Sequence, residues 1–210
     1  MGEIIKLPVQ AAKFGYKRVP GRTRDREDPA QLPLFPPVPA EVLYLSVPES
    51  PFAHALLLDE RGDPRAVDLY LKAIAEQNCV ADAYCNLGII ESKKGNTSKA
   101  LDCLTKALKH DPRHSEAHYN LANIYLDLND FRLAQIHYEI SVEIDPKFPN
   151  ALFNLALVLS INKDFTAAIA ALTKYQEIAA PADARKSEEL LDNLRKSLTA
   201  AGVRGASIKL

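Results

Sequence analysis

An asparagine that recurs at a fixed interval offers the clearest chemistry in this sequence. Asn86, Asn120 and Asn154 are each 34 residues apart. A side-chain amide carries both a hydrogen-bond donor and an acceptor, so it can pair with the backbone of a peptide whatever the sequence of that peptide. If a repeated fold brings the three amides into one row, they predict a ladder that holds an extended chain.

Other residue types that support catalysis or metal binding are not arranged for it. His110, His114 and His118 are spaced four residues apart, but Pro112 interrupts any helix between them, and no acidic cluster with ligand spacing accompanies them. We therefore expect turn and helix-surface histidines, and no metal. Cys85 is expected to be a small apolar residue rather than a nucleophile. The sequence has no glycine-rich phosphate loop, G-x-S-x-G or H-E-x-x-H motif, so we predict no enzyme and no cofactor.

Composition narrows the class of protein further. The 210 residues carry 26 Lys and Arg against 27 Asp and Glu, which excludes a globally basic nucleic-acid binder and a strongly acidic chain. Three cysteines without C-x-x-C spacing argue against a disulfide framework and a zinc finger. The sequence has no long apolar run and no signal-peptide pattern. We therefore expect a cytoplasmic protein that makes no membrane contact.

The 34-residue period extends to other residue types, which indicates a repeat. The repeated columns are a leucine at Leu87, Leu121 and Leu155, an alanine at Ala66, Ala100, Ala134 and Ala168, and an Asp-Pro pair at Asp111-Pro112 and Asp145-Pro146. Apolar residues with helical spacing occur twice in each unit, which predicts two helices per unit. Asp130 and Asp164 are expected to cap second helices, and Asp63-Pro64 is expected to start another. Small residues such as Gly88 would let paired helices approach closely.

These columns resemble the tetratricopeptide repeat, a 34-residue helix–turn–helix unit. The matching residues in the first clear unit are Tyr84, Leu87, Gly88, Ala100, Leu104, Ala107 and Pro112, and the next unit repeats them as His118, Leu121, Ala122, Tyr125, Ala134, Tyr138, Ser141 and Pro146. The resemblance implies an all-α fold, a right-handed α-solenoid of about 3.5–4 such units. In that family the first helices line a concave groove that binds another protein.

The predicted organisation has three parts. Residues 1–49 form a proline-rich, partly basic leader that is either disordered or packed on the solenoid. Residues 50–182 hold a degenerate unit at 50–80 and clear units at 81–114, 115–148 and 149–182. Residues 183–210 form a capping helix and a tail, because apolar residues from Leu190 to Leu198 fall on one face of a charged helix.

By resemblance to the family, the groove side chains can be named. Beside the three asparagines they include Asp82, Glu116, Tyr119, Asn123 and Phe153. We predict a non-enzymatic adaptor that binds a peptide through the asparagine ladder, with Tyr119 and Phe153 as apolar anchors. Family members that bind the acidic tails of chaperones use Lys and Arg at positions that here hold acidic, aromatic and asparagine residues. We therefore expect a basic, polar or neutral partner.

The leader leaves a second function open. Residues 1–26 contain seven Lys and Arg against two acidic residues, a net charge of +5, and such a segment can either contact nucleic acid or remain a solvated tail. Gln31, Leu32, Leu34 and Phe35 resemble the Q-L-x-L-F motif by which bacterial proteins bind the DNA polymerase sliding clamp. The alternative prediction is a DNA-associated factor that works through residues 1–40.

Overall fold

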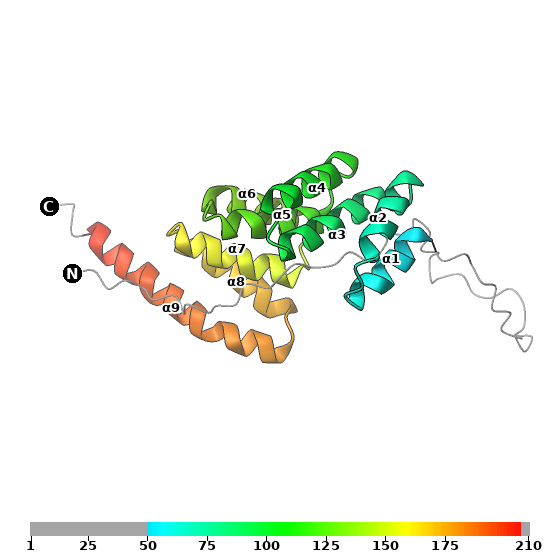
Figure 1. Cartoon of the computed structure of the whole chain (residues 1–210). Coiled ribbons are helices and arrows are strands. Elements are labelled where there is room, and N and C mark those ends of the chain that lie inside the picture. The colour runs from blue at the N-terminus through cyan, green and yellow to red at the C-terminus, as the bar shows by residue number, and fades with distance from the viewer. Residues whose placement is uncertain (1–49, 207–210) are drawn as a thin grey trace, which may run out of the picture.

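The computed structural model describes residues 50–206, and every regular element in that part of the chain is a helix. The elements are α1 (Pro51–Glu60), α2 (Ala66–Ala75), α3 (Val80–Lys93), α4 (Thr97–His110), α5 (Ser115–Asp127), α6 (Phe131–Ile144), α7 (Pro149–Ile161), α8 (Phe165–Ile178) and α9 (Pro181–Ala206). Figure 1 shows them as pairs stacked side by side, with α1 and α2 at one end and α9 at the other. The expected leader at 1–49 lies outside the described residues.

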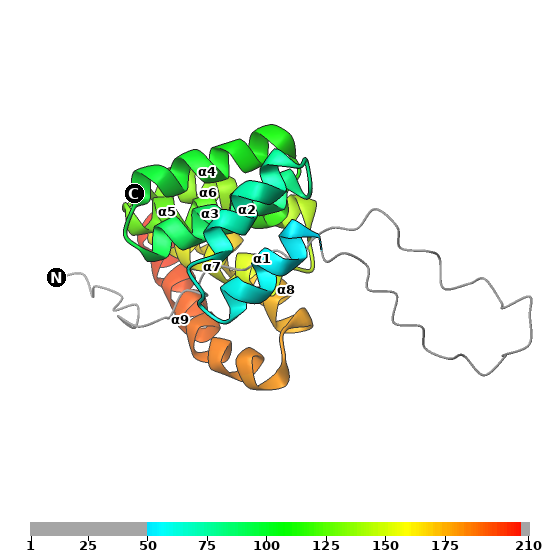
Figure 2. The ribbon, with the colours of Figure 1, turned by 45° about the vertical axis from the view of Figure 1, so that its right-hand side comes forward.

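The helix pairs stack in sequence order. The two helices of each pair, such as α3 with α4, pack against each other, and each second helix packs against the first helix of the next pair. The first helices α3 and α5 also contact each other directly, so they lie on the inner side of the curved stack. Figure 2 shows the same order from a second direction. The inner face is therefore made by α3, α5 and α7, as the family resemblance implies.

The second helices contribute a repeated small–large column to the core. Each alanine of the 34-residue column is followed four residues later by a large apolar side chain, so both lie on one helix face. All eight are almost completely buried: Ala66 and Tyr70, Ala100 and Leu104, Ala134 and Tyr138, Ala168 and Leu172. The small residue lets the paired helix approach, and the large one fills the space between pairs.

Gly88 shows how close that approach is. A Cβ atom at this position would lie 2.8 Å from Cγ of Leu104 and 3.3 Å from the carbonyl oxygen of Ala100. Side chains do not pack at the first of these distances, so Leu104 would have to move. The expectation that a small residue here permits the contact of α3 with α4 is consistent with this geometry.

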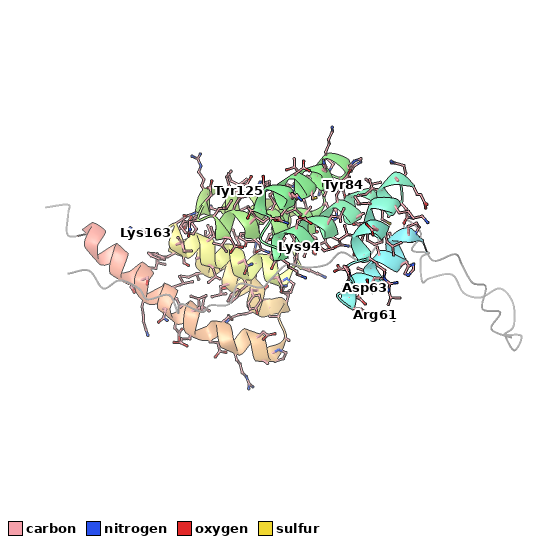
Figure 3. All side chains as sticks on the ribbon, in the orientation of Figure 1. Arg61, Asp63, Tyr84, Lys94, Tyr125 and Lys163 are labelled. Atoms are coloured by element: carbon pink, nitrogen blue, oxygen red, sulfur yellow. The ribbon has the colours of Figure 1, made fainter. Side chains whose placement is uncertain are left out.

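The turns inside the units repeat a left-handed residue. Gly95, Asn129 and Lys163 have φ of 80°, 60° and 65°, and they occupy the same position in successive units. This conformation ends one helix and redirects the chain into the next. Figure 3 shows Lys163 at such a turn. Asp130 then caps α6 by accepting from the backbone N–H of Leu133 at 3.1 Å, and Asp164 caps α8 in the same way, as predicted.

The start of α2 differs from the prediction. The Asp63-Pro64 pair was expected to cap and begin this helix, but α2 begins at Ala66. Asp63 instead accepts from the backbone N–H of Arg65 at 2.9 Å, and its carboxylate also pairs with the Arg65 guanidinium. That local turn uses the carboxylate before the helix begins, and Figure 3 shows Asp63 in this turn.

The last helix closes the stack. Leu190, Leu191 and Leu194 of α9 are buried, and α9 packs against α8, whereas Leu198 is 39% exposed. The predicted apolar face thus covers the end of the solenoid. No helix in residues 50–206 is long and apolar enough to cross a membrane.

Candidate functional site

The predicted asparagine ladder lies on the three inner helices, and its side chains are buried. Asn86 is on α3, Asn120 on α5 and Asn154 on α7, and each is 0% exposed. Nδ2 of Asn120 donates to Sγ of Cys85 at 3.4 Å, which links α5 to α3. The fold therefore places the three amides at equivalent positions of successive inner helices.

Asn154 belongs to a hydrogen-bond network that joins α5, α6 and α7. Its Nδ2 lies 3.0 Å from Oδ1 of Asn123, 3.3 Å from the hydroxyl of Tyr138 and 3.4 Å from that of Tyr119. The Tyr138 hydroxyl also donates to Oδ1 of Asn123 at 2.6 Å. Nδ2 of Asn123 is the one buried side-chain polar atom in the described residues without a hydrogen-bond partner. Such a donor is costly unless something accepts from it.

The two predicted aromatic anchors lie in different environments. Tyr119 is fully buried, with its ring centroid 4.8 Å from that of Phe148 and 5.9 Å from that of Tyr138. Phe153 is only half-buried, and its ring packs at 5.2 Å against Tyr175. Phe153 is therefore the more accessible of the two apolar surfaces.

Asp82 joins one repeat to the next through His114. Nε2 of His114 lies 3.0 Å from Oδ1 of Asp82, and both side chains are buried. Nδ1 of His114 accepts from the backbone N–H of Ala117 at 3.2 Å and so caps α5. In the neutral ring Nδ1 is the acceptor, and the proton on Nε2 is donated to Asp82. In the protonated ring Nδ1 also carries a proton, which faces Oε2 of Glu116, so this nitrogen cannot then accept from Ala117.

The charge states at this position follow from its burial and its bonds. Burial lowers the pKa of His114, but the hydrogen bonds to Asp82 and Glu116 outweigh it, so the pKa lies above its ordinary value of 6.5. Burial raises the pKa of Glu116, but its bonds to His114 and Ser115 outweigh this effect and lower it to about 2. Glu116 is therefore ionised at neutral pH, with Oε2 3.4 Å from Nδ1 of His114. The inner face is acidic here.

The prediction of surface histidines was wrong for two of the three. His114 is fully buried and His118 is 8% exposed, because the close stacking of units encloses the residues at each unit boundary. Nε2 of His118 donates to the carbonyl oxygen of Pro112 at 3.2 Å, and its Nδ1 accepts from Nδ1 of His137 at 3.0 Å. Only His110 fits the prediction: it is exposed and stacks on Tyr84 at 5.7 Å.

His137 gives the fold a measurable dependence on pH. Burial, followed by the charge of His118, lowers the pKa of His137 to about 4. The unfolded chain takes up this proton near pH 6.5 and the folded chain resists it down to about pH 4, so this group makes the folded state less stable as the pH falls through that window. A glutamine at position 137 can still donate a hydrogen bond to His118, but its side chain does not titrate. We therefore expect His137→Gln to lose less stability than the wild type between pH 7 and pH 4 in urea denaturation. An equal loss in both proteins would contradict this assignment.

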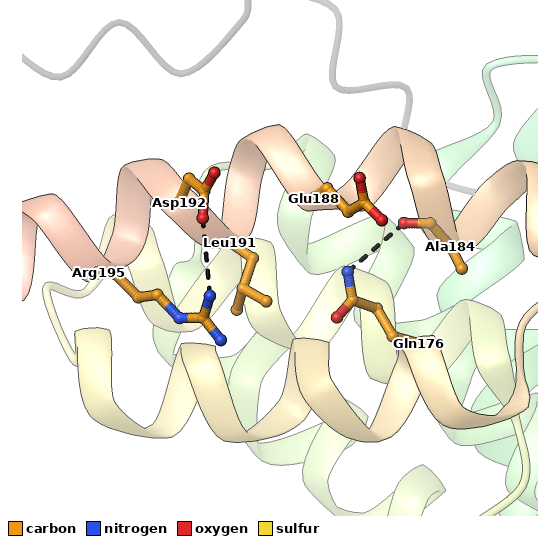
Figure 4. A pocket seen from close by; sticks show the side chains of 6 residues that line it. All are labelled: Gln176, Ala184, Glu188, Leu191, Asp192 and Arg195. Carbon is orange, nitrogen blue, oxygen red and sulfur yellow. Dashed lines mark hydrogen bonds and ion pairs between the residues drawn. The ribbon is translucent and has the colours of Figure 1, made fainter.

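The cysteines and the remaining surface suggest no other site. Burial raises the pKa of the Cys79 and Cys103 thiols, so neither is an activated nucleophile. Within residues 50–206 no group of three or more His, Cys, Asp or Glu side chains could hold a metal. A shallow hollow of about 440 Å³ lies between α8 and α9 (Figure 4), but it is lined by bonded side chains such as Gln176 and Arg195. The predicted clamp motif, Gln31, Leu32, Leu34 and Phe35, and the basic residues 1–26 lie outside the described residues.

Comparison with known proteins identifies the repeats. Residues 81–114 match one family model described as tetratricopeptide repeat, and residues 119–184 match a second with the same description. The chain is a tetratricopeptide repeat protein. Two solved structures share the fold: the first such domain of Spaghetti (RPAP3) bound to an HSP90 peptide, and MamA. Each has a TM-score of 0.52, with 20% and 19% identity over 57% and 74% of this chain and 93% and 97% of theirs. The predicted all-α tetratricopeptide solenoid is thereby confirmed.

Curated relatives match only through a segment. The chain is 30% identical over 108 residues to "Protein O-mannosyl-transferase TMTC3" of Homo sapiens, and 30% identical over 107 residues to the protein of the same name from Mus musculus. Each match covers 51% of this tetratricopeptide repeat protein but only 12% of the relative. The similarity thus concerns one part of those proteins, and their transferase activity is not carried over.

Proposed function

We propose that this chain is a non-enzymatic scaffold that binds an extended protein segment along α3, α5 and α7. Tetratricopeptide repeats and the solved peptide complex of a protein with this fold support a protein-interaction scaffold. The observation that carries the finer proposal is the row of amides at one position of three successive inner helices. An extended segment offers a carbonyl and an N–H at regular intervals, and a row of amides can pair with both.

Asn123 supports the same proposal. Its Nδ2 is a buried donor without a partner in the described residues, while its Oδ1 is already held by Tyr138 and Asn154. The carbonyl oxygen of a bound peptide would satisfy that donor. Asn123 is thus the amide for which a ligand would bring the largest gain in hydrogen bonding.

The charge of the inner face sets the chemistry of the partner. Asp82 is buried there, and Glu116 is ionised at neutral pH because its pKa is about 2. The HSP90 peptide in the solved complex, SRMEEVD, is acidic. A segment of that charge would be repelled here, so we propose a basic, polar or neutral partner and not an acidic chaperone tail.

The rival function uses the leader. The net charge of +5 over residues 1–26 and the Gln31–Phe35 motif favour a DNA-associated factor, whose partner would be nucleic acid or the sliding clamp. A cytoplasmic location, inferred from the cysteine usage, stays a prediction.

Partner capture by the full chain distinguishes the two functions. We expect the variant with Asn86→Ala, Asn120→Ala and Asn154→Ala to lose the captured protein, because the backbone of the bound segment loses its partners. Asn162→Ala is the matched control, since its exposed amide bonds to Gln135 away from the row. Circular dichroism establishes that both variants are folded.

Two outcomes would count against the scaffold. One is a captured protein that the triple variant retains. The other is capture that fails when Leu34 and Phe35 are replaced by alanine, or DNA binding that weakens steeply with salt, since both features belong to the rival.

A further inference from the structure

Several side chains of the inner face are buried although no helix of the described part lies across it. On α3, Asp82, Cys85 and Asn86 are at most 5% exposed, and on α5 Tyr119 and Asn120 are 0% exposed. By contrast, Leu71 and Leu128, outside this face, are each 52% exposed. Within residues 50–206 the helix pairs in extended contact are neighbours in sequence, apart from α3 with α5. Cys85 and Tyr119 are buried by packing between the helices. Nδ2 of Asn123, in contrast, is a buried donor of this face without an acceptor in the described residues, which favours a further segment that supplies one.

Charge favours the basic leader of the same chain as that segment. By resemblance to the family, five residues of each inner helix face the groove, and among them are two acidic residues but no Lys or Arg. The fifteen are Asp82, Cys85, Asn86, Ile89, Ser92, Glu116, Tyr119, Asn120, Asn123, Leu126, Asn150, Phe153, Asn154, Leu157 and Ser160. Even with His114 protonated beside them, the two carboxylates leave a net negative charge on the inner face. Residues 1–26 carry seven cations against two acids. Opposite charges at close range favour binding, most strongly where the site is shielded from water.

Length and tethering make the arrangement feasible. Neighbouring helices pack about 8–10 Å apart, so the face made by α3, α5 and α7 is on the order of 30 Å long, and about ten extended residues would span it. The leader has 49 residues and joins α1 directly. A tether of this kind raises the local concentration of the leader to the order of millimolar.

We propose that the basic part of the leader, residues 1–26, binds in the groove of its own chain and competes there with the external partner. The inference rests on the proposed function, because both occupants use the same amide row. It adds a regulation: the partner must displace the leader, so anything that neutralises or sequesters the leader would increase partner binding.

Thiol labelling of the full chain tests this. In a Cys79→Ser, Cys103→Ser background the single remaining thiol, Cys85, reports access to the groove. Reversing four cations of the leader should raise the rate at which Cys85 reacts with a small disulfide reagent at least tenfold. The four changes, made together, are Lys17→Glu, Arg18→Glu, Arg22→Glu and Arg24→Glu. The matched control reverses four exposed cations of the second helices, by Lys99→Glu, Lys109→Glu, Arg132→Glu and Lys174→Glu, and should leave the rate unchanged. Ser92→Cys in a Cys85→Ser form of this background gives a second, half-buried probe at a groove position.

The outcomes separate this inference from the function on which it rests. Unchanged labelling at both probes, with helicity intact, would overturn the leader as occupant. Rates that fall with increasing protein concentration would instead indicate a second copy of the chain and would equally overturn it. In either case partner capture that still depends on the three asparagines would leave the scaffold standing.

Discussion

Asp82→Leu is expected to lower the free energy of unfolding by about 3–5 kcal/mol at pH 6, where His114 is protonated in the folded chain. The substitution leaves the buried imidazole without the acceptor that lies 3.0 Å away. At a pH above the folded pKa of His114 the ring is neutral, and the cost falls to about 1–3 kcal/mol, that of an unsatisfied buried donor.

The direction of the pH effect follows from the pKa. The folded pKa of His114 lies above 6.5, so the stabilisation from its charge is fully present below pH 6.5 and is lost as the pH rises through the folded value. Urea denaturation of wild type and variant at pH 6 and at high pH measures the difference. Asp82→Asn keeps an oxygen acceptor and serves as the control, with a smaller loss. A gap between Asp82→Leu and wild type that is independent of pH would mean that no charged pair forms.

Tyr138→Ala is expected to cost about 3–5 kcal/mol, because it removes a fully buried ring from the contact of three helices. Tyr138→Phe separates packing from hydrogen bonding. It keeps the ring but removes the hydroxyl that lies 2.6 Å from Asn123 and 3.3 Å from Asn154, and we expect it to cost about 1–3 kcal/mol.

Tyr125→Phe is the matched control for that loss. Tyr125 is half-buried and its ring stacks on that of His137, with the centroids 5.6 Å apart, so loss of its hydroxyl should alter stability by no more than about 0.5 kcal/mol. In chemical denaturation, the loss of stability should be largest for Tyr138→Ala, smaller for Tyr138→Phe and smallest for Tyr125→Phe. If Tyr138→Phe were as stable as the wild type, the network would contribute nothing to folding.

The fold could be predicted because the repeat constrains many residues at once. A column such as Leu87, Leu121 and Leu155 holds the residues that make the same packing contact in successive units. A single sequence therefore contains several examples of one structure. The caps at Asp130 and Asp164 were predicted for the same reason. The start of α2 was not predicted correctly, because the turn of the degenerate unit at 50–80 is not repeated in the other units.

The site could be predicted only in part. Equivalent positions identified the three asparagines but not how deeply they are buried, because burial depends on neighbouring units and on whatever covers the inner face. The pairs of His114 with Asp82 and of His118 with His137 bring together residues 32 and 19 positions apart. Neither spacing matches the 34-residue period, so no column of the repeat could reveal them. Helical spacing alone predicted surface histidines. That prediction failed for His114 and His118 because the packing of one unit on the next buries both side chains.

The affinity of the captured partner segment, as a synthetic peptide, for the full chain tests the central claim most directly. Titration calorimetry should show that Asn86→Ala, Asn120→Ala and Asn154→Ala together weaken binding at least a hundredfold, which corresponds to about 2.7 kcal/mol. Asn162→Ala should bind as the wild type does. Equal affinity for wild type and a folded triple variant would contradict the amide row as the binding surface.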